Sequence, residues 1–204
     1  MVRTIGIIPA GGAAIRFHGL QKELLPVSET ETALERCIYS MFLGGTDEIF
    51  IITSNSRNVT HKTATVIYKD HPKLSDVFVT AANLTADWYY FAMPDTVYPT
   101  NIFAVKKSAP VMVGAFLTDK PERFGMLRDG QIVDTEKGAP GKAWGALILD
   151  SASMIYLARQ AVKTYNHTAA LNALLNLGYD EFPIEYYYDF ATYNDYVEYV
   201  CRTS

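Results

Sequence analysis

The sequence has few cysteines, no long apolar run and no excess of positive charge. Its two cysteines, Cys37 and Cys201, are too few for a disulfide scaffold and lack the spacing of a metal site. No apolar stretch approaches the ~20 residues of a membrane-spanning helix, and the amino-terminal residues do not form a secretion signal. The 18 basic and 22 acidic residues give a net charge of −4, which does not indicate a surface for nucleic acids or anionic membranes. We therefore expect a soluble cytoplasmic protein that binds neither.

Internal repeats, low-complexity tracts and linker-like runs are also absent from the sequence. The 204 residues include 49% hydrophobic and 20% charged residues, which is close to ordinary globular usage. One domain over residues 1–204 is the expectation, since domains average roughly 150 residues. The sequence leaves open whether the chain forms a homo-oligomer.

Segments typical of strands and of helices alternate in the first half of the chain. Short apolar runs predict buried strands, and apolar residues at helical spacing predict helices between them. Strands are expected over Thr4–Ile8, Glu48–Thr53, Thr65–Tyr68 and Trp88–Met93, and helices over Thr32–Leu43 and Leu74–Leu84. Such alternation requires crossover connections, and it therefore predicts a mostly parallel sheet with helices on both faces.

The second half mixes strands and helices in a less regular order. Asp129-Gly130 lies between two apolar segments and fits a two-residue type I′ turn, which predicts a hairpin. Further strands are expected over Val111–Phe116, Ala143–Leu149 and Pro183–Tyr188, and helices over Ser151–Thr164, Thr168–Leu177 and Asn194–Cys201. The predicted fold class is therefore a single-domain α/β protein with a mixed, mostly parallel sheet.

A glycine-rich turn follows the first predicted strand directly. In open parallel sheets ligands bind beyond the carboxyl ends of the strands, where Ala10-Gly11-Gly12 stands. Glycines let backbone N–H groups converge on an anion, and Arg16 and Lys22 add positive charge suited to phosphate oxygens. A plain tight turn explains two glycines equally well. The P-loop and the dinucleotide fingerprint are both excluded, because their further required residues are missing.

Five motifs of the chain resemble, in order, those of nucleotidyltransferases that activate sugar 1-phosphates. The sequence contains Ala10-Gly11-Gly12-x-x-x-Arg16 and Lys22-x-Leu24-Leu25-Pro26-Val27 near its start, then Ala92-Met93-Pro94-Asp95-Thr96, then Phe124-Gly125-Met126 with Glu136-Lys137 and Gly145, and finally Tyr188-Asp189-Phe190-Ala191-Thr192. It departs from the family pattern at Ala14, Ile15, Gln21, Gly138 and Ala191. The short spacer between Arg16 and Lys22 is nearer to that of cytidylyltransferases for polyol or alcohol phosphates.

This resemblance implies a magnesium-dependent transfer between a nucleoside triphosphate and a phosphorylated acceptor, with release of pyrophosphate. It assigns Mg²⁺ to Asp95 and Asp189, and catalytic contacts with the triphosphate to Arg16 and Lys22. Nucleotide binding would fall to Ala10, Gly11, Gly12 and Ser75, the last through a likeness of Lys73–Val77 to a base-binding motif of cytidylyltransferases. Acceptor binding would fall to Gly125, Glu136 and Lys137. The halves of the domain would be a nucleotide-binding part at about 1–108 and an acceptor-binding part at about 109–204.

Simpler explanations exist for several of these residues. Asp95 could form a turn or cap a helix, and Asp189 could cap the last helix. Glu136 and Lys137 could form a solvated hairpin end, and Ser75 could be an ordinary residue of a helix terminus. Two other functions also stay open: a nucleotide-sugar glycosyltransferase, although Asp95-Thr96-Val97 offers one acid where that class uses two, and a non-catalytic nucleotide-binding protein.

Overall fold

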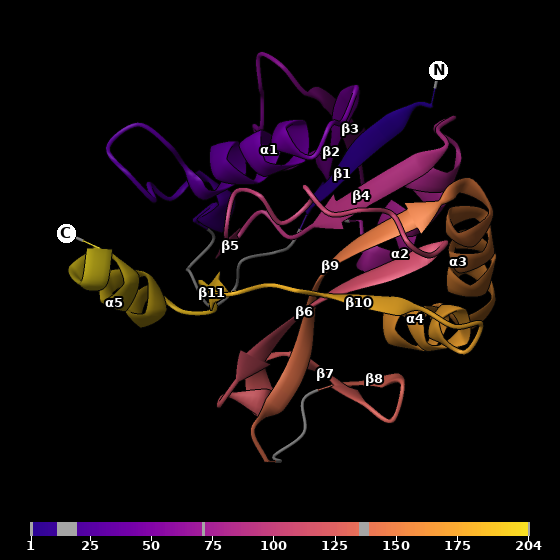
Figure 1. Cartoon of the computed structure of the whole chain (residues 1–204). Helices are drawn as coiled ribbons and strands as arrows, with labels where there is room; N and C mark the ends of the chain where they lie inside the picture. Colours follow the sequence, from indigo (N-terminus) through magenta and orange to yellow (C-terminus); the bar gives the residue numbers. More distant parts are fainter. Residues whose placement is uncertain (1, 12–19, 71, 135–138, 204) are drawn as a thin grey trace.

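The computed structural model describes residues 2–11, 20–70, 72–134 and 139–203, which form one large sheet covered by helices on both faces (Figure 1). The sheet has nine strands within these residues, and seven of them form the order β10-β6-β9-β4-β1-β2-β3. Its strands are β1 (Thr4–Ala10), β2 (Glu48–Ser54), β3 (Thr65–Lys69), β4 (Trp88–Ala92), β6 (Val111–Thr118), β7 (Gly125–Arg128), β8 (Gln131–Asp134), β9 (Gly141–Asp150) and β10 (Asp180–Pro183). The helices are α1 (Ala33–Leu43), α2 (Leu74–Ala82), α3 (Ser151–Thr164), α4 (His167–Leu175) and α5 (Tyr193–Thr203).

The sheet is mostly parallel, as the alternation of the first half predicts. β1 pairs in parallel with β2 and β4, β2 with β3, and β6 with β10. β9 runs against its neighbours β4 and β6, and its first residues also pair with the β7–β8 hairpin. The predicted mixed α/β fold is confirmed.

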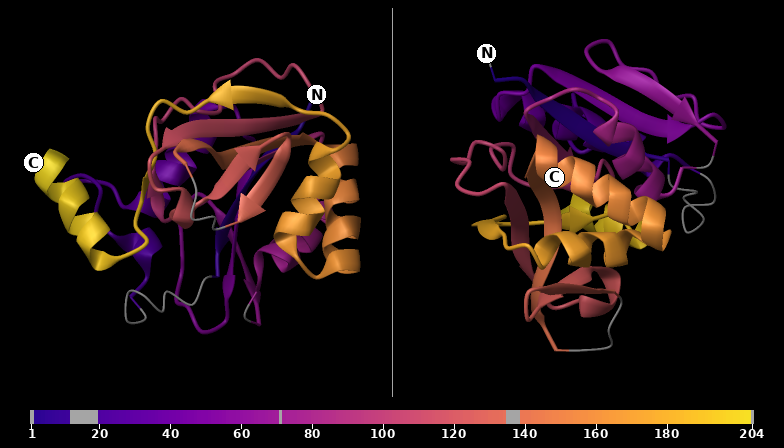
Figure 2. Two further views of the ribbon diagram at one scale, coloured as in Figure 1. Left: turned by 90° about the horizontal axis from the view of Figure 1, so that it is seen from below. Right: turned by 90° about the vertical axis from the view of Figure 1, so that its right-hand side faces the viewer.

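The two faces of the sheet carry separate hydrophobic clusters. α1 packs on one face through residues such as Leu34, Cys37 and Met41. α2, α3 and α4 pack on the other face, where Phe78, Leu157 and Leu171 belong to a second cluster. All seven residues of β1 are buried, which explains why this strand reads as a continuous apolar run. α5 lies apart from α3 and α4, near the opposite end of the molecule (Figure 2).

Local signals at the ends of elements act as the sequence indicates. The Thr32 hydroxyl accepts from the Glu35 N–H at 3.2 Å, and the Glu35 carboxylate accepts from the Thr32 N–H at 2.7 Å, which closes a capping box on α1. Asp129 and Gly130 both have positive φ values, 48° and 77°, as the two-residue turn between β7 and β8 requires. The predicted hairpin is therefore confirmed.

The predicted strand over Pro183–Tyr188 is wrong, because this segment divides between two sheets. β10 ends at Pro183, and Tyr187 leaves the line of the strand to stack on Phe116 with ring centroids 4.1 Å apart. A separate two-residue strand, β11 (Tyr188–Asp189), then pairs antiparallel with β5 (Thr96–Val97). No helix within the described ranges is both long and apolar enough to cross a membrane.

Candidate active site

Asp95 and Asp189 are brought together by the small β5–β11 ladder. Asp95 follows the end of β4 and directly precedes β5, whereas Asp189 is the last residue of β11. In the ladder Asp189 lies opposite Thr96, and the Phe190 N–H donates to the Asp95 carbonyl at 3.1 Å. The ladder thus places two acids that are distant in the chain beside the carboxyl end of β4.

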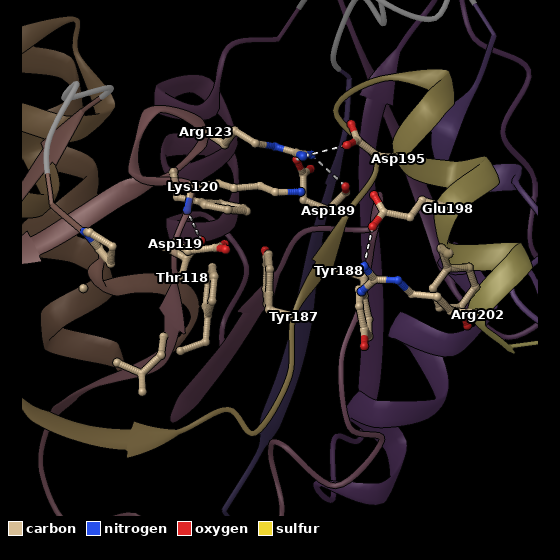
Figure 3. A pocket seen from close by; sticks show the side chains of 16 residues that line it. Thr118, Asp119, Lys120, Arg123, Tyr187, Tyr188, Asp189, Asp195, Glu198 and Arg202 are labelled. Atoms are coloured by element: carbon tan, nitrogen blue, oxygen red, sulfur yellow. Dashed lines mark hydrogen bonds and ion pairs between the residues drawn. The ribbon is translucent and has the colours of Figure 1, made fainter.

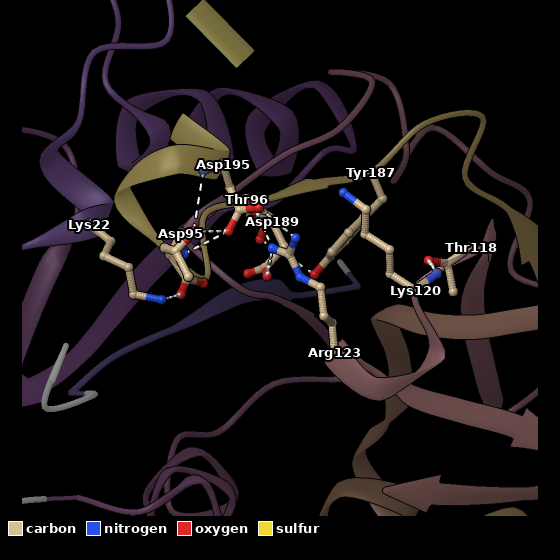
Figure 4. A network of polar contacts seen from close by, with 10 residues as sticks. Lys22, Asp95, Thr96, Thr118, Lys120, Arg123, Tyr187, Asp189 and Asp195 are labelled. Atoms are coloured by element: carbon tan, nitrogen blue, oxygen red, sulfur yellow. Dashed lines mark hydrogen bonds and ion pairs between the residues drawn. The ribbon is translucent and has the colours of Figure 1, made fainter. Parts of the chain in front are cut away.

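Each of these carboxylates has a cationic partner (Figure 4). Lys22 Nζ lies 2.8 Å from Asp95 Oδ2, and an Arg123 guanidinium nitrogen lies 2.9 Å from Asp189 Oδ2. The four side chains are only 16–19% exposed, so water screens these interactions less than at a free surface. Lys22 belongs to a single 3-10 turn, η2 (Lys22–Leu24), and Arg123 ends another, η3 (Pro121–Arg123).

The electrostatics of Asp189 show that the two acids influence one another. Burial raises the pKa of the Asp189 carboxyl, and the nearby charge of Asp95 raises it further. The hydrogen bond from Arg123 and the charges of Lys22 and Arg123 lower this pKa without reversing the net shift. Two carboxylates in one partly buried place attract a cation, which relieves their repulsion.

The glycine turn begins at the same edge of the sheet. Ala10 is the buried last residue of β1, and its carbonyl accepts from the Thr53 hydroxyl of β2 at 2.9 Å. A Cβ atom on Gly11 would lie 2.6 Å from Cγ of Pro72, which precedes α2, so the close approach of these two segments requires glycine. The predicted residues Gly12 and Arg16 lie outside the described residues.

Ser75 is a buried residue in the first turn of α2, three positions after Pro72. The simpler explanation from the sequence, a residue of a helix terminus, describes this position correctly. Because Pro72 touches the glycine turn, the start of α2 borders the candidate site. A contact between Ser75 and a nucleotide stays a prediction.

The structure describes only one of the three predicted acceptor-binding residues. Gly125 begins β7, where a Cβ atom would lie 2.5 Å from Trp144 Nε1 and 2.9 Å from Ile132 Cγ2. Packing against Trp144 is therefore a sufficient reason for glycine at this position, and acceptor binding by Gly125 stays a prediction. Glu136 and Lys137 lie outside the described residues.

Arg123 is a residue of the site that the sequence motifs do not single out. Its other guanidinium nitrogen lies 2.7 Å from Asp195 Oδ1, and Asp195 in turn accepts from the N–H and hydroxyl of Thr192 at the start of α5. Arg123, Asp189 and Asp195 line one wall of a cavity of about 650 Å³ that also borders Tyr187 (Figure 3). The signal that could have identified Arg123 is its place one residue before Phe124-Gly125.

Comparison with solved structures identifies the architecture. No protein-family model matches the chain, and no curated protein matches it in sequence. A crystal structure of a Bacillus anthracis protein assigned as a glucose-1-phosphate thymidylyltransferase, in complex with sucrose, superposes with a TM-score of 0.81. The match covers 98% of this chain and 94% of that one, at 19% sequence identity.

The two chains share one fold. The shared fold extends over nearly the whole of this chain. The likeness concerns architecture, because 19% identity leaves most side chains different.

Proposed function

We propose that the chain is a magnesium-dependent nucleotidyltransferase that joins a nucleoside triphosphate to a sugar 1-phosphate or a similar phosphorylated acceptor. The observation that carries this proposal is the meeting of Asp95, Asp189 and Lys22 at the carboxyl end of β4, the neighbour of β1 in the sheet. The ordered motifs in the sequence and the fold shared with the solved structure both support it.

The carboxylate pair fits a magnesium ion. Mg²⁺ prefers hard oxygen ligands and keeps several waters, so it is commonly held by one or two carboxylates together with substrate phosphates. Asp95 and Asp189 supply such a pair, and no cluster of three or more potential protein ligands occurs in the described part of the chain. The bound ion would neutralise charge on the phosphates and help to align them.

In the proposed reaction, an oxygen of the acceptor phosphate forms a bond to the α-phosphorus of the triphosphate. The bond from this phosphorus to the bridging oxygen breaks, and pyrophosphate leaves with the electron pair. Transfers of this kind require alignment and charge stabilisation more than covalent participation by the protein. Lys22 would stabilise charge near the α-phosphate, while Arg16 and the turn at Ala10, Gly11 and Gly12 would hold the leaving pyrophosphate.

The acceptor would bind on the side of the β7–β8 hairpin. Lys137 would attract its phosphate, Glu136 would accept hydrogen bonds from its hydroxyl groups, and Gly125 would allow close approach of the backbone. Ser75, at the start of α2, would contact the base. These assignments rest on the sequence motifs.

One assay tests the proposed function. The chain is mixed with Mg²⁺, each of the common nucleoside triphosphates and a panel of sugar and polyol phosphates, and pyrophosphate release is measured. We expect pyrophosphate release with one combination of triphosphate and phosphorylated acceptor, and no release when Mg²⁺ is left out. Release of free nucleoside diphosphate from a nucleotide sugar would instead identify a glycosyltransferase. Triphosphate binding without turnover on any acceptor would identify a non-catalytic nucleotide-binding protein.

A further inference from the structure

Glu23 is a buried carboxylate next to the candidate catalytic lysine. The residue is only 4% exposed, and among the described residues it is the one Asp, Glu, Lys or Arg that is classed as buried. Its carboxylate accepts a hydrogen bond from the guanidinium group of Arg57, with the two side chains 5% and 9% exposed. The sequence motifs assign no role to either residue.

Stability alone is a weak reason for this ion pair. The desolvation of two charges offsets most of their attraction, and apolar side chains of similar size often stabilise a protein as well or better. In some proteins a buried ion pair instead fixes one arrangement among several.

The pair joins the turn that carries Lys22 to the edge of the sheet. Arg57 follows β2, in a turn closed by a 2.9 Å hydrogen bond from its N–H to the Ser54 carbonyl. The end of β2 pairs with the end of β1, where Thr53 lies beside Ala10. Glu23 is thus tied to the same edge from which the glycine turn begins.

η2 is a short turn that also contacts α1. It is three residues long, no side chain among the described residues caps its start, and its own backbone bonds are Leu24 N–H to the Gln21 carbonyl and Leu25 N–H to the Lys22 carbonyl, both 3.1 Å. Successive side chains of a 3-10 turn point about a third of a revolution apart. When Glu23 is held inward on Arg57, Lys22 is therefore directed elsewhere, and it reaches Asp95 Oδ2 at 2.8 Å.

We propose that the Glu23–Arg57 ion pair is a clamp that positions Lys22 in the active site. Both are positioning residues, because they act through Lys22. The inference about catalysis rests on the proposed function, whereas the inference about the placement of Lys22 stands on the geometry alone.

The test replaces both charges together, so that no unpaired charge is buried. The double variant Glu23→Leu/Arg57→Met is expected to fold with a melting temperature close to that of the wild type. The matched control is Glu31→Leu/Arg36→Met, which removes an ion pair of 2.9 Å between the segment before α1 and α1 itself and does not involve Glu23. Both double variants are made with Lys22 intact and with Lys22→Ala.

The first readout is the chemical reactivity of the Lys22 amine, which does not depend on activity. Trace acetylation followed by mass spectrometry compares Lys22 with the exposed Lys106 of the same molecule. In the wild type Lys22 is expected to react slowly, since its side chain is 16% exposed and paired with Asp95. Its rate should rise several-fold in the clamp variant and stay constant in the control. An unchanged rate in a folded clamp variant overturns the proposal.

The second readout is turnover. The clamp variant should lose at least ~10-fold in kcat, with KM for the acceptor changed little, because misplacing a catalytic group by about 1 Å costs up to roughly 100-fold. In the Lys22→Ala background the clamp substitutions should have no further effect on kcat. The same loss in both backgrounds would refute an action through Lys22. If the wild type transfers no nucleotidyl group, or Lys22→Ala has no measurable activity, the acetylation experiment alone decides whether the Glu23–Arg57 pair positions Lys22.

Discussion

Arg123 holds both the main chain and the side chain of Asp189. One guanidinium nitrogen donates to the Asp189 carbonyl and to its Oδ2 atom, each at 2.9 Å, and the other nitrogen reaches Asp195. Arg123 immediately precedes Phe124 and the β7–β8 hairpin, so it connects this hairpin with a candidate metal ligand. It fixes one carboxylate oxygen of Asp189 by a direct contact.

This contact predicts a pH dependence of magnesium binding. Burial and Asp95 raise the pKa of Asp189, so falling pH protonates this carboxyl above the usual aspartate range and would weaken the binding of Mg²⁺ to the proposed site. Arg123→Met removes a group that lowers this pKa and should move the loss of binding to higher pH. Calorimetric titration with Mg²⁺ over a pH series measures the midpoint. Arg36→Met is the control, and an unchanged midpoint in Arg123→Met would contradict the prediction.

Asp95→Asn should abolish turnover while the melting temperature stays nearly constant. The amide removes one negative charge from the proposed metal site, and a loss of at least ~100-fold is expected, as for other groups that stabilise charge in transition states. Asp129→Asn is the matched control, because asparagine also tolerates the positive φ at this turn position. Pyrophosphate release and thermal unfolding are measured on both. A large loss of stability with activity retained would make Asp95 a structural turn residue.

Gly125→Ala should lower the free energy of unfolding by about 1–3 kcal/mol, the usual cost of overpacking. The new methyl group would lie 2.5 Å from Trp144 Nε1. Gly141→Ala should be nearly neutral, since its methyl group would meet only the Met126 Cε atom at 3.5 Å. Urea unfolding of both variants measures the difference. Equal stability of the two variants would contradict the prediction, because it would mean that Trp144 and Ile132 move aside at little cost.

Lys137→Ala should raise KM for the phosphorylated acceptor more than KM for the triphosphate. The reason is the sequence-based assignment of Lys137 to the acceptor phosphate, because an interaction with one substrate mainly affects the binding of that substrate. Steady-state kinetics with each substrate varied in turn provides the comparison. Lys142→Ala, which removes an exposed ion pair with Glu181, is the control. Equal changes in both KM values would exclude this placement of Lys137.

The sequence predicts the central sheet well because each of its strands has a recognisable local pattern of apolar residues. β1 is a largely apolar run that stops before the glycines, and β2 and β4 have the same character. The strand predicted over Thr4–Ile8 ends two residues early, because Pro9 and Ala10 continue the pairing with β2. Two helices begin after residue types that favour N-caps, since the side chains of Thr32 and Asp150 cap α1 and α3. Each of these patterns involves only residues that are close in the sequence, so it can be recognised without knowledge of the tertiary structure.

The contacts that bring the site residues together are harder to predict from the sequence. β5 and β11 are two residues each, too short for any periodicity, and their pairing depends on contacts between distant segments. The family motifs associate Asp95 with Asp189, yet they give no reason to expect Arg123 or the Glu23–Arg57 pair. Tyr187 looked like part of a strand because aromatic residues favour strands, and its stacking on Phe116 is a long-range contact that overrides this preference.

The course of β9 determines how the β7–β8 hairpin is joined to the main sheet. Its first residues pair with β6 and touch β7, and its later residues pair with both β6 and β4 in the middle of the molecule. Between these two parts the ladder of β9 with β6 has one register shift, at Gly114 and Ala115, which leaves Gly145 of β9 without a partner in β6. Because the ladder is already interrupted there, any bending of the β7–β8 hairpin against the main sheet is expected at this shift.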